Sequence, residues 1–543
     1  NVSRGYRQRV GLADALVDDI LGREVTLAPA AELALYSPAL ATSTPADCLA
    51  ALRATWSEAA GRKLFVSGNL ELSGAAQKIA AAYQTSQRNP VSPPVPTATA
   101  AFAYTDFGKP GKVDETASVE DLGVTLLEFK NGVRLNLKPT DYEAGSIRVS
   151  VRLGGGTLTL PRAQPGLGLL ANVAFTTGGL GRHSVDDLQR LLAGRTVGLA
   201  FGAQADAFTF AATTNRQDLL LQLQLFCAYL TDPGYRPESL RQVQKLADQT
   251  YRRLAHTAEG PLQLKTASLL ANGDPRFGLP PKDVLLARTL DELKAWLTPQ
   301  FAKGPIEIAI VGDLDPDATI AAVASTFGAL PKRQKKPAYK KERTVAKLAE
   351  PISREFPIES AIPKALVRLY WPATDAHDVR LARRLRLLSG ILADRLRVKI
   401  REEMGGTYSP NAGADLSETY PGYGYLIADA TVAPGQTRAV AAAIRAVAAA
   451  LHTDGVTEEE LLRAKEPTFT ALRESTRDNT YWLNAVLADA QEFPARLDWC
   501  RTRYSDTEAV TATELSALAK EYLDPARASE FIVVPEQTKP AQP

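Results

Sequence analysis

The sequence predicts an α+β protein made of repeated sandwich domains, in which helices pack on one face of a mainly antiparallel sheet. One observation is the order of the patterns, since strand-like apolar stretches are followed by stretches with the three- and four-residue apolar spacing of helices. The second is an internal repeat. A helix, a strand and a turn recur, so that Gly68 aligns with Gly312 at an offset of 244 and Ile308 with Phe531 at an offset of 223.

The composition is that of a globular protein. Of 543 residues, 45% are hydrophobic and 23% are charged, and the net charge is +2. We therefore expect no nucleic acid as a partner. We also expect no membrane span, because no apolar run reaches the length that crosses a bilayer. Cys48, Cys227 and Cys500 lie too far apart for a disulfide framework or a cysteine zinc site.

Residues 1–85 are predicted to be the end of a domain whose body lies outside this chain. Thr44 and Pro45 mark a helix start, residues 63–67 are typical of a strand, and residues 74–83 favour a second helix. No signal-peptide pattern follows Asn1. We expect the missing N-terminal part to hold at least the rest of this domain.

Residues 86–120 are predicted to be an extended, proline-rich linker, and residues 121–331 the next domain. Its opening hairpin is signalled by Asn131-Gly132, the preferred two-residue turn between antiparallel strands. The strands and helices expected after the hairpin are a strand at 147–153, helices at 167–176 and 184–192, strands at 197–202 and 207–213, and helices at 219–230 and 237–254.

Residues 332–351 form a basic linker, which is expected to be solvated rather than to bind nucleic acid. The last domain, residues 352–535, repeats the plan and leaves residues 536–543 as a tail. Its expected elements are strands at 365–370 and 423–427 and helices at 381–404, 439–451 and 458–473.

The end of the helix at 381–404 is the candidate functional joint. Gly405 and Gly406 stop this helix, with Arg401 just before the stop and Tyr408 just after it. A guanidinium and a phenol are thereby brought close, and both can donate to carbonyl or carboxylate oxygens. The structural alternative is that Arg401 complements the helix C-terminus and Tyr408 is an ordinary strand aromatic.

The sequence contains no other convincing catalytic motif. No two of the four histidines lie within ten residues of each other, whereas HExxH and HxxEH place two zinc ligands one turn apart. Gly166 and Gly168 begin a match to a dinucleotide fingerprint, but prolines rather than a strand precede it. No serine stands in a GxSxG motif.

The stretch Arg401-Glu-Glu-Met-Gly-Gly-Thr-Tyr408, the hairpin at Asn131-Gly132 and the repeated endings resemble pitrilysin-type (inverzincin, insulinase-like) zinc metallopeptidases. The resemblance covers nearly the whole chain and implies the C-terminal half of a two-half enzyme. Each half of such an enzyme holds two related α+β domains, and the halves close around a peptide. The resemblance implies that Arg401 binds and orients the substrate and that Tyr408 donates to the oxyanion.

The chain departs from the family at the zinc motif. An active first domain has Gly-Leu-Ala-His-Phe-Leu-Glu-His, whereas this chain has Gly-Leu-Gly-Leu-Leu-Ala-Asn-Val from Gly166. Leu169 and Val173 stand at ligand positions and Asn172 at the position of the base, and none can bind zinc or take a proton. We therefore expect no zinc or base residues here, no metal in this chain and no cleavage by it alone.

The resemblance implies proteolysis at a zinc ion held by an N-terminal half, in the same polypeptide or a separate subunit, with a peptide as substrate. The alternative is a non-catalytic scaffold or interaction subunit descended from such a peptidase. The resemblance is to bacterial-type enzymes of this family, and the high alanine and arginine content indicates a GC-rich genome. We expect the periplasm as the location, with the cytoplasm as alternative. The sequence predicts neither the peptide, nor the cleavage preference, nor the oligomeric state.

Overall fold

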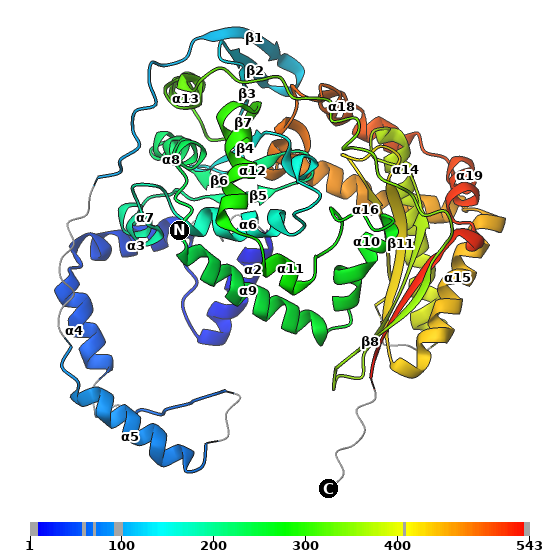
Figure 1. Ribbon diagram of the computed structural model, residues 1–543, viewed down its shortest axis with the longest axis horizontal. Coiled ribbons are helices and arrows are strands. Elements are labelled where there is room, and N and C mark those ends of the chain that lie inside the picture. The colour runs from blue at the N-terminus through cyan, green and yellow to red at the C-terminus, as the bar shows by residue number, and fades with distance from the viewer. Residues whose placement is uncertain (1–8, 57–60, 69–71, 92–100, 405–408, 537–543) are drawn as a thin grey trace. The chain divides into compact units, whose positions relative to one another are not determined.

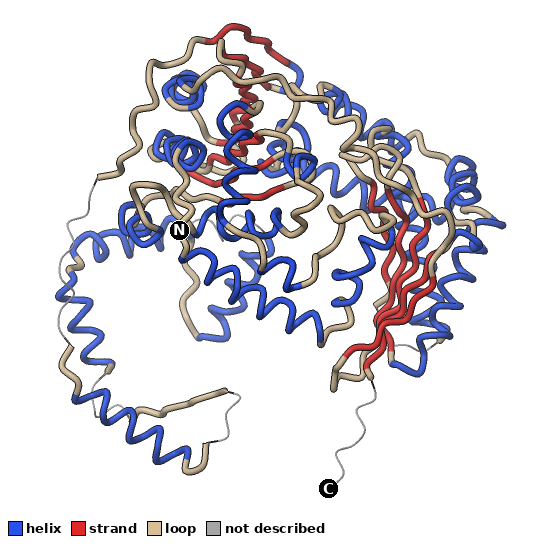
Figure 2. Tube along the Cα trace, viewed as in Figure 1, coloured by secondary structure: helices blue, strands red, loops and turns tan. Residues whose placement is uncertain are grey.

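Two open β-sheets form the framework of the larger part of the chain (Figures 1 and 2). The computed structural model describes residues 9–56, 61–68, 72–91, 101–404 and 409–536. They belong to two units, Asn1–Thr97 and Ala98–Pro543, and each unit is described by itself. One of six described strand pairings in the first sheet is parallel, as is one of four in the second. The predicted α+β class is confirmed.

The first sheet has the strand order β1-β2-β3-β7-β4-β6-β5. Its predicted hairpin is confirmed, because β2 and β3 run antiparallel on either side of Asn131 and Gly132. Gly132 has a φ of 83°, which glycine adopts without strain. The strands are β1 (Val113–Val119), β2 (Val124–Phe129), β3 (Val133–Pro139), β4 (Ile147–Leu153), β5 (Ala200–Ala203), β6 (Phe208–Thr214) and β7 (Ile306–Gly312).

The second sheet has the order β10-β11-β9-β12-β8 and repeats the topology of the first. Read in the same direction, β3-β7-β4-β6-β5 corresponds to β8-β12-β9-β11-β10. In both sheets the last strand of the repeat, β7 or β12, lies between one parallel and one antiparallel neighbour. The strands are β8 (Ser353–Ile358), β9 (Ala365–Pro372), β10 (Asn411–Leu416), β11 (Gly424–Val432) and β12 (Ser529–Pro535).

Helices cover the inner face of each sheet and form its main core, as Figure 1 shows for α14, α15 and α19 beside the second sheet. The first core includes α6 (Leu167–Thr177), α7 (Val185–Leu191), α8 (Leu219–Thr231), α9 (Glu238–Ala255), α12 (Leu290–Lys303) and α13 (Pro316–Ser325). The second includes α14 (Val379–Leu396), α15 (Thr437–Asp454), α16 (Glu458–Ser475) and α19 (Ala512–Tyr522). The remaining helices of this unit are α10 (Ala267–Leu270), α11 (Lys282–Leu286), α17 (Asn479–Tyr481) and α18 (Ala495–Glu508).

The outer face of each sheet is also buried, against a segment from the other half of the unit. On the first sheet, Val124 and Ala309 pack with the π-helical turn η8 (Trp482–Leu487). On the second, Phe531 packs with Leu262, which opens the π-helical turn η4 (Leu262–Thr266). The turn η4 follows α9 and the turn η8 follows α16, and these two long helices hold the same place in the repeated order. Each half of the unit therefore covers the outer face of the other half's sheet. The sequence reasoning expected helices on one face only and missed this second layer.

Two predicted linkers contain ordered structure. Residues 113–119 lie within the predicted linker 86–120, yet they form the edge strand β1. Charged residues such as Asp114 and Glu115 conceal its strand pattern, as is usual for an edge that must not pair with other chains. In the predicted basic linker, Arg333 is only 6% exposed. Its guanidinium donates to carbonyls at the C-terminal end of α12, where a cation is favoured.

The smaller unit contains four helices and no strand among its described residues: α2 (Arg9–Gly22), α3 (Pro29–Thr42), α4 (Pro45–Thr55) and α5 (Ala75–Arg88). The two predicted helices are confirmed as α4 and α5. The predicted strand at 63–67 is wrong for this structure, because residues 61–68 have no regular secondary structure. An isolated strand has no ladder partners, and the described part of this unit offers none.

None of the described helices is by itself long and apolar enough to cross a bilayer. Residues 434–454 and 458–475 are long and apolar enough only when the two helices are taken together, and these helices are bent by 112° relative to each other.

We predict that Leu487→Ala lowers the free energy of unfolding by about 2–5 kcal/mol, because the fully buried side chain fills the contact between η8 and the first sheet. Leu462→Ala is the matched control, since Leu462 is 64% exposed, and it should change stability by less than about 0.5 kcal/mol. Urea denaturation measures both. Equal effects of the two variants would contradict the packing described for η8.

Candidate functional site

The degenerate zinc-motif positions lie on α6. Asn172 accepts a hydrogen bond at its side-chain carbonyl from the backbone N–H of Ala203, at 2.8 Å. Ala203 belongs to β5, one of the two edge strands of the sheet. The side chain of Asn172 therefore pairs with a backbone N–H at an edge that has no further strand beside it. Leu169 and Val173 are half-buried, and Val173 packs against the main core. The residues at all three positions thus have no metal-binding or proton-accepting group, and Asn172 has a structural contact.

The residues that the structure describes do not fit a zinc ion. Among the described residues, no three histidine, cysteine, aspartate or glutamate side chains gather as a metal site requires. His183 instead accepts from the backbone N–H of Ala103 at 3.0 Å and stacks on Phe102 with ring centroids 5.7 Å apart. His377 pairs with Asp375 at 2.9 Å.

Arg401 lies near the end of the helix that was singled out from the sequence. Apolar residues recur along this helix at steps of three and four, and Leu385, Leu388, Leu392 and Leu396 of α14 form a fully buried stripe. The chain then continues as a π-helical turn, η6 (Arg397–Glu403). Such turns are rare in proteins, and those that occur are frequently found at functional sites.

The side chain of Arg401 is exposed, and in the described part of the chain it has no hydrogen-bond or ion-pair partner. Its neighbours in the same stretch differ. Arg395 binds Glu460 through two contacts of 2.6 and 2.9 Å, and Arg397 reaches Asp394 at 3.4 Å. Arg401 is therefore free to bind a carbonyl or carboxylate oxygen of a ligand. Tyr408 lies outside the residues that the structure describes.

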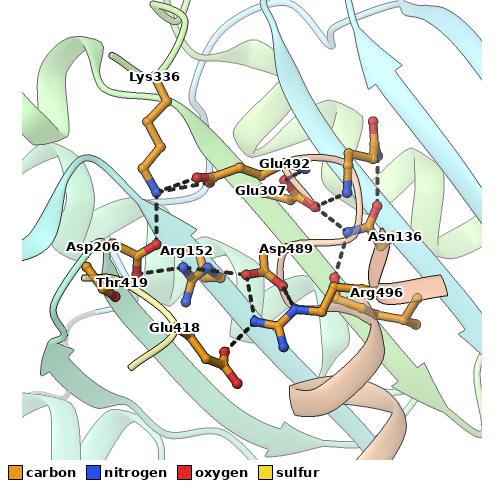
Figure 3. A network of polar contacts seen from close by, with 12 residues as sticks. Asn136, Arg152, Asp206, Glu307, Lys336, Glu418, Thr419, Asp489, Glu492 and Arg496 are labelled. Atoms are coloured by element: carbon orange, nitrogen blue, oxygen red, sulfur yellow. Dashed lines mark hydrogen bonds and ion pairs between the residues drawn. The ribbon is translucent and has the colours of Figure 1, made fainter. Parts of the chain in front are cut away.

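A second polar site lies where the segment after η8 meets the outer face of the first sheet (Figure 3). Arg152 on β4 lies 2.9 Å from Asp206 and 3.9 Å from Asp489. Burial opposes ionisation of Asp206, but Arg152 and Lys336 favour the carboxylate and lower its pKa to about 2. Arg496 on α18 extends the network to Asp489 at 3.0 Å and to Glu418 at 2.6 Å.

Glu307 on β7 is the buried centre of this site. It is 6% exposed, and its carboxylate accepts hydrogen bonds from the backbone N–H groups of Gln491 at 2.7 Å and Glu492 at 3.0 Å. The side-chain amide of Asn136 donates a third at 2.7 Å. Burial raises the pKa of Glu307 to about 7, and the hydrogen bonds from Gln491 and Asn136 only partly offset it.

Asn136 on β3 completes the connection. Its amide also donates to the carbonyl of Leu487 at 2.7 Å, and its carbonyl accepts from the side chain of Gln491 at 2.7 Å. Asn136 is fully buried, so an unpaired amide there would be costly. Asn136 and Glu307 together tie residues 487–492 to the first sheet.

A cavity of about 760 Å³ opens beside Glu307. Its walls are the ends of the strands, the chain at 332–338 and residues 491–493. Eight lysine and arginine side chains line it against four carboxylates, which favours an anionic group. Much of the positive charge is already paired, as in the 2.8 Å contact of Lys336 with Glu492.

The sequence reasoning missed this polar site. A signal was present at Glu307, because it interrupts a strand, β7, that is otherwise apolar. A polar residue in a buried strand needs a partner, but the partners lie 171 to 355 positions away along the chain.

Comparison with known proteins adds the family. Residues 288–467 match the family model described as the peptidase M16 inactive domain. This third of the chain is thus similar to an inactive domain of the M16 peptidases. The predicted relationship to the pitrilysin-type peptidases is thereby confirmed.

The stromal processing peptidase of Pisum sativum, a chloroplast protein, is 21% identical to this chain over 415 residues. The match covers 68% of this chain and 33% of the pea protein, so the chain spans about a third of the length of such relatives.

Solved structures share the fold. The periplasmic protease PqqL from Escherichia coli superposes with a TM-score of 0.67 at 18% identity, covering 98% of this chain and 60% of PqqL. The peptidase M16 inactive domain from Pseudomonas fluorescens gives a TM-score of 0.63 at 20% identity, covering 77% of this chain and all of that domain.

We predict that the stability of the chain falls between about pH 4.5 and pH 7 through Glu307. Its folded-state pKa lies above the ordinary value of 4.5, so the folded chain holds this proton more tightly than the unfolded one. The contribution is fully present below about pH 4.5 and is lost as the pH rises through about 7, a change on the order of 3 kcal/mol.

The measurement is the free energy of unfolding from pH 4.5 to 8 for the unmodified chain, Glu307→Gln and Glu128→Gln. Glu307→Gln should lose this part of the pH dependence. Glu128→Gln should keep it, because Glu128 has a 43% exposed side chain on β2, which β3 separates from β7. Parallel curves for the unmodified chain and Glu307→Gln would show that Glu307 does not titrate in this range.

Proposed function

We propose that this chain is the half of an M16 zinc peptidase that lacks the metal, and that it closes over a peptide for hydrolysis at a zinc site on the other half. The observation that carries the proposal is at α6. Asn172 stands where the family has its base and binds the edge of the chain's own sheet instead. The match to an inactive domain supports the same assignment.

In this proposal Arg401 and Tyr408 contact the substrate. The guanidinium of Arg401 is exposed and has no partner among the described residues, which supports a role in binding a backbone carbonyl or the C-terminal carboxylate of the peptide. Tyr408 would donate to the oxygen that gains charge when the peptide carbonyl is attacked. The zinc ion in the other half would supply the activated water.

The partner in this proposal is the zinc-bearing N-terminal half, in the same polypeptide or as a separate subunit. A periplasmic location stays a prediction. The fold of the periplasmic protease PqqL supports it, while the pea relative is chloroplastic.

We predict that Arg401→Ala lowers kcat/KM at least tenfold when this chain is combined with the zinc-bearing half, which corresponds to about 1.4 kcal/mol of barrier. Arg401→Lys should recover only part of the loss, because lysine lacks the bidentate fork. Arg397→Ala is the matched control, since Arg397 lies in the same turn but reaches Asp394. Turnover within about threefold of the unmodified pair for Arg401→Ala would refute the contact with substrate.

We also predict that Tyr408→Phe lowers kcat more than it raises KM, because the hydroxyl acts on charge that develops in the transition state.

Metal analysis of the purified chain separates the roles of the halves. Less than one zinc per ten chains is expected for this chain alone, and stoichiometric zinc would overturn the proposal. A stable complex without cleavage of any peptide would favour the scaffold alternative.

A further inference from the structure

A smaller cavity of the larger unit, of about 350 Å³, lies where α18 packs against α14, α16 and η8 (Figure 1). The charged side chains that line it are four arginines and one glutamate: Arg383, Arg386, Arg496, Arg503 and Glu418. The rest of the wall is mostly apolar and includes Leu387, Leu472 and Trp499. Pockets of this size and lining are typical of sites for small ligands.

This cavity is separate from the candidate joint at Arg401. Arg386 stands in the first half of α14, whereas Arg401 follows the end of that helix. Because a helix rises by about 1.5 Å per residue, the two arginines lie on the order of 20 Å apart along the axis. The proposed function therefore leaves the cavity without a role.

Arg503 on α18 is a buried cation without a counter-ion. It is 9% exposed, and no carboxylate pairs with it in the described part of the chain. Its guanidinium donates to the hydroxyl of Ser475 at 3.0 Å and lies over the ring of Tyr481 at 4.4 Å. Burial raises the pKa of Tyr481, so this phenol stays neutral and offers no negative charge. A buried charge is normally paired, because its desolvation is costly.

Two other arginines of the cavity wall have the carboxylate that Arg503 lacks. Arg383 on α14 pairs with Asp506. Arg496 on α18 lies 3.0 Å from Asp489. The local sequence and fold thus supply counter-ions to these neighbouring guanidinium groups, and the one that is left without a counter-ion faces the cavity.

Arg386 adds a second positive charge that is not neutralised. Its side chain is exposed, and among the described residues its guanidinium has no hydrogen-bond or ion-pair partner. Burial lowers the pKa of the neighbouring Arg383, Asp506 opposes this effect, and the positive charge of Arg386 adds to the lowering. An anion in the cavity would reduce this repulsion and give Arg503 a counter-ion.

We infer that this cavity binds a carboxylate that is carried on an apolar group. The carboxylate lies at Arg386 and Arg503, because a guanidinium presents parallel donors that match its two oxygens. The apolar group packs against Leu387, Leu472 and Trp499. Inorganic phosphate would match the arginines, but it would leave this part of the wall without an apolar partner.

Two kinds of molecule carry this chemistry. One is a small free acid with a short hydrocarbon or aromatic body. The other is the carboxyl end of a peptide whose last residue is apolar. Both present one negative charge next to apolar surface, so the same side chains of the cavity recognise them.

Isothermal titration of octanoate into the full chain tests the inference. One site per chain is expected, with a Kd on the order of 0.1 mM. Octanamide has the same length but no charge, and it should bind at least about tenfold more weakly. Acetate has the charge but no chain, and it should also bind at least about tenfold more weakly. An affinity for octanamide or acetate equal to that for octanoate would overturn the inference.

Arg503→Met removes the buried charge and keeps an apolar side chain of similar length. It should weaken octanoate binding at least about tenfold. The midpoint of thermal unfolding should stay the same or rise, because an unpaired buried charge is removed. Octanoate affinity that survives in Arg503→Met, together with a lower midpoint, would show that Arg503 has only a structural role and would overturn the inference.

Arg386→Gln is a second variant that folding should tolerate, since Arg386 is exposed. It should weaken octanoate binding at least about threefold. Arg438→Gln is the matched control, because Arg438 on α15 is also exposed without a partner among the described residues and does not line the cavity. It should change the affinity less than twofold, and equal effects of the two variants would contradict a contact between Arg386 and the ligand.

A pair of peptides distinguishes the two sources of the carboxylate. A tripeptide that ends in leucine is titrated with a free carboxyl end and as its C-terminal amide. Binding of the acid that is tighter than that of octanoate and is lost in the amide assigns the site to peptide ends. Weaker binding of the acid assigns the site to a free small acid. Failure of both octanoate and the peptide acid to bind at millimolar concentration would overturn the inference.

Discussion

The contact of residues 487–492 with the outer face of the first sheet is the constraint on which the larger unit depends. A sheet covered on both faces has no water to satisfy its polar side chains, so each must find a protein partner. Glu307 and Asn136 stand in the middle strands, and the backbone of this segment completes their hydrogen bonds. Separation of the two repeats within the larger unit would expose apolar surface and leave Glu307 and Asn136 without their partners. The two repeats should therefore unfold cooperatively.

The two outer-face contacts have different chemistry although they occupy equivalent places. The contact on the second sheet is apolar and aromatic, with the Tyr425 hydroxyl donating to the carbonyl of Leu270 at 2.9 Å. The contact on the first sheet joins an apolar layer to a network of carboxylates and guanidinium groups. Proton concentration and salt therefore act on one side of the unit much more than on the other.

Sequence patterns predicted the elements well where local rules decide them. The Asn131-Gly132 turn, the apolar stripe of α14 and the capped start of α4 follow from spacing and turn chemistry. The strand at 63–67 was predicted from the same kind of pattern but is absent, because a strand requires neighbours that local sequence cannot supply. Glu307, Asn136 and the burial of Arg333 were missed since their partners are distant in sequence. For the candidate joint, Arg401 lies near the helix end as predicted, but that it has no partner among the described residues could be learned only from the folded chain.

The π-helical turn η6 has a consequence for how this protein can change over time. A π turn holds one residue more than an α turn, so the direction of every side chain beyond it depends on that extra residue. Each residue of an α-helix turns the chain by about 100°. Loss of a single residue between positions 397 and 400 would let α14 run on as a regular helix and would swing Arg401 to a different side. The orientation of this guanidinium is thus sensitive to chain length as well as to side-chain identity, and a one-codon deletion could redirect it while every residue of the buried stripe stays the same.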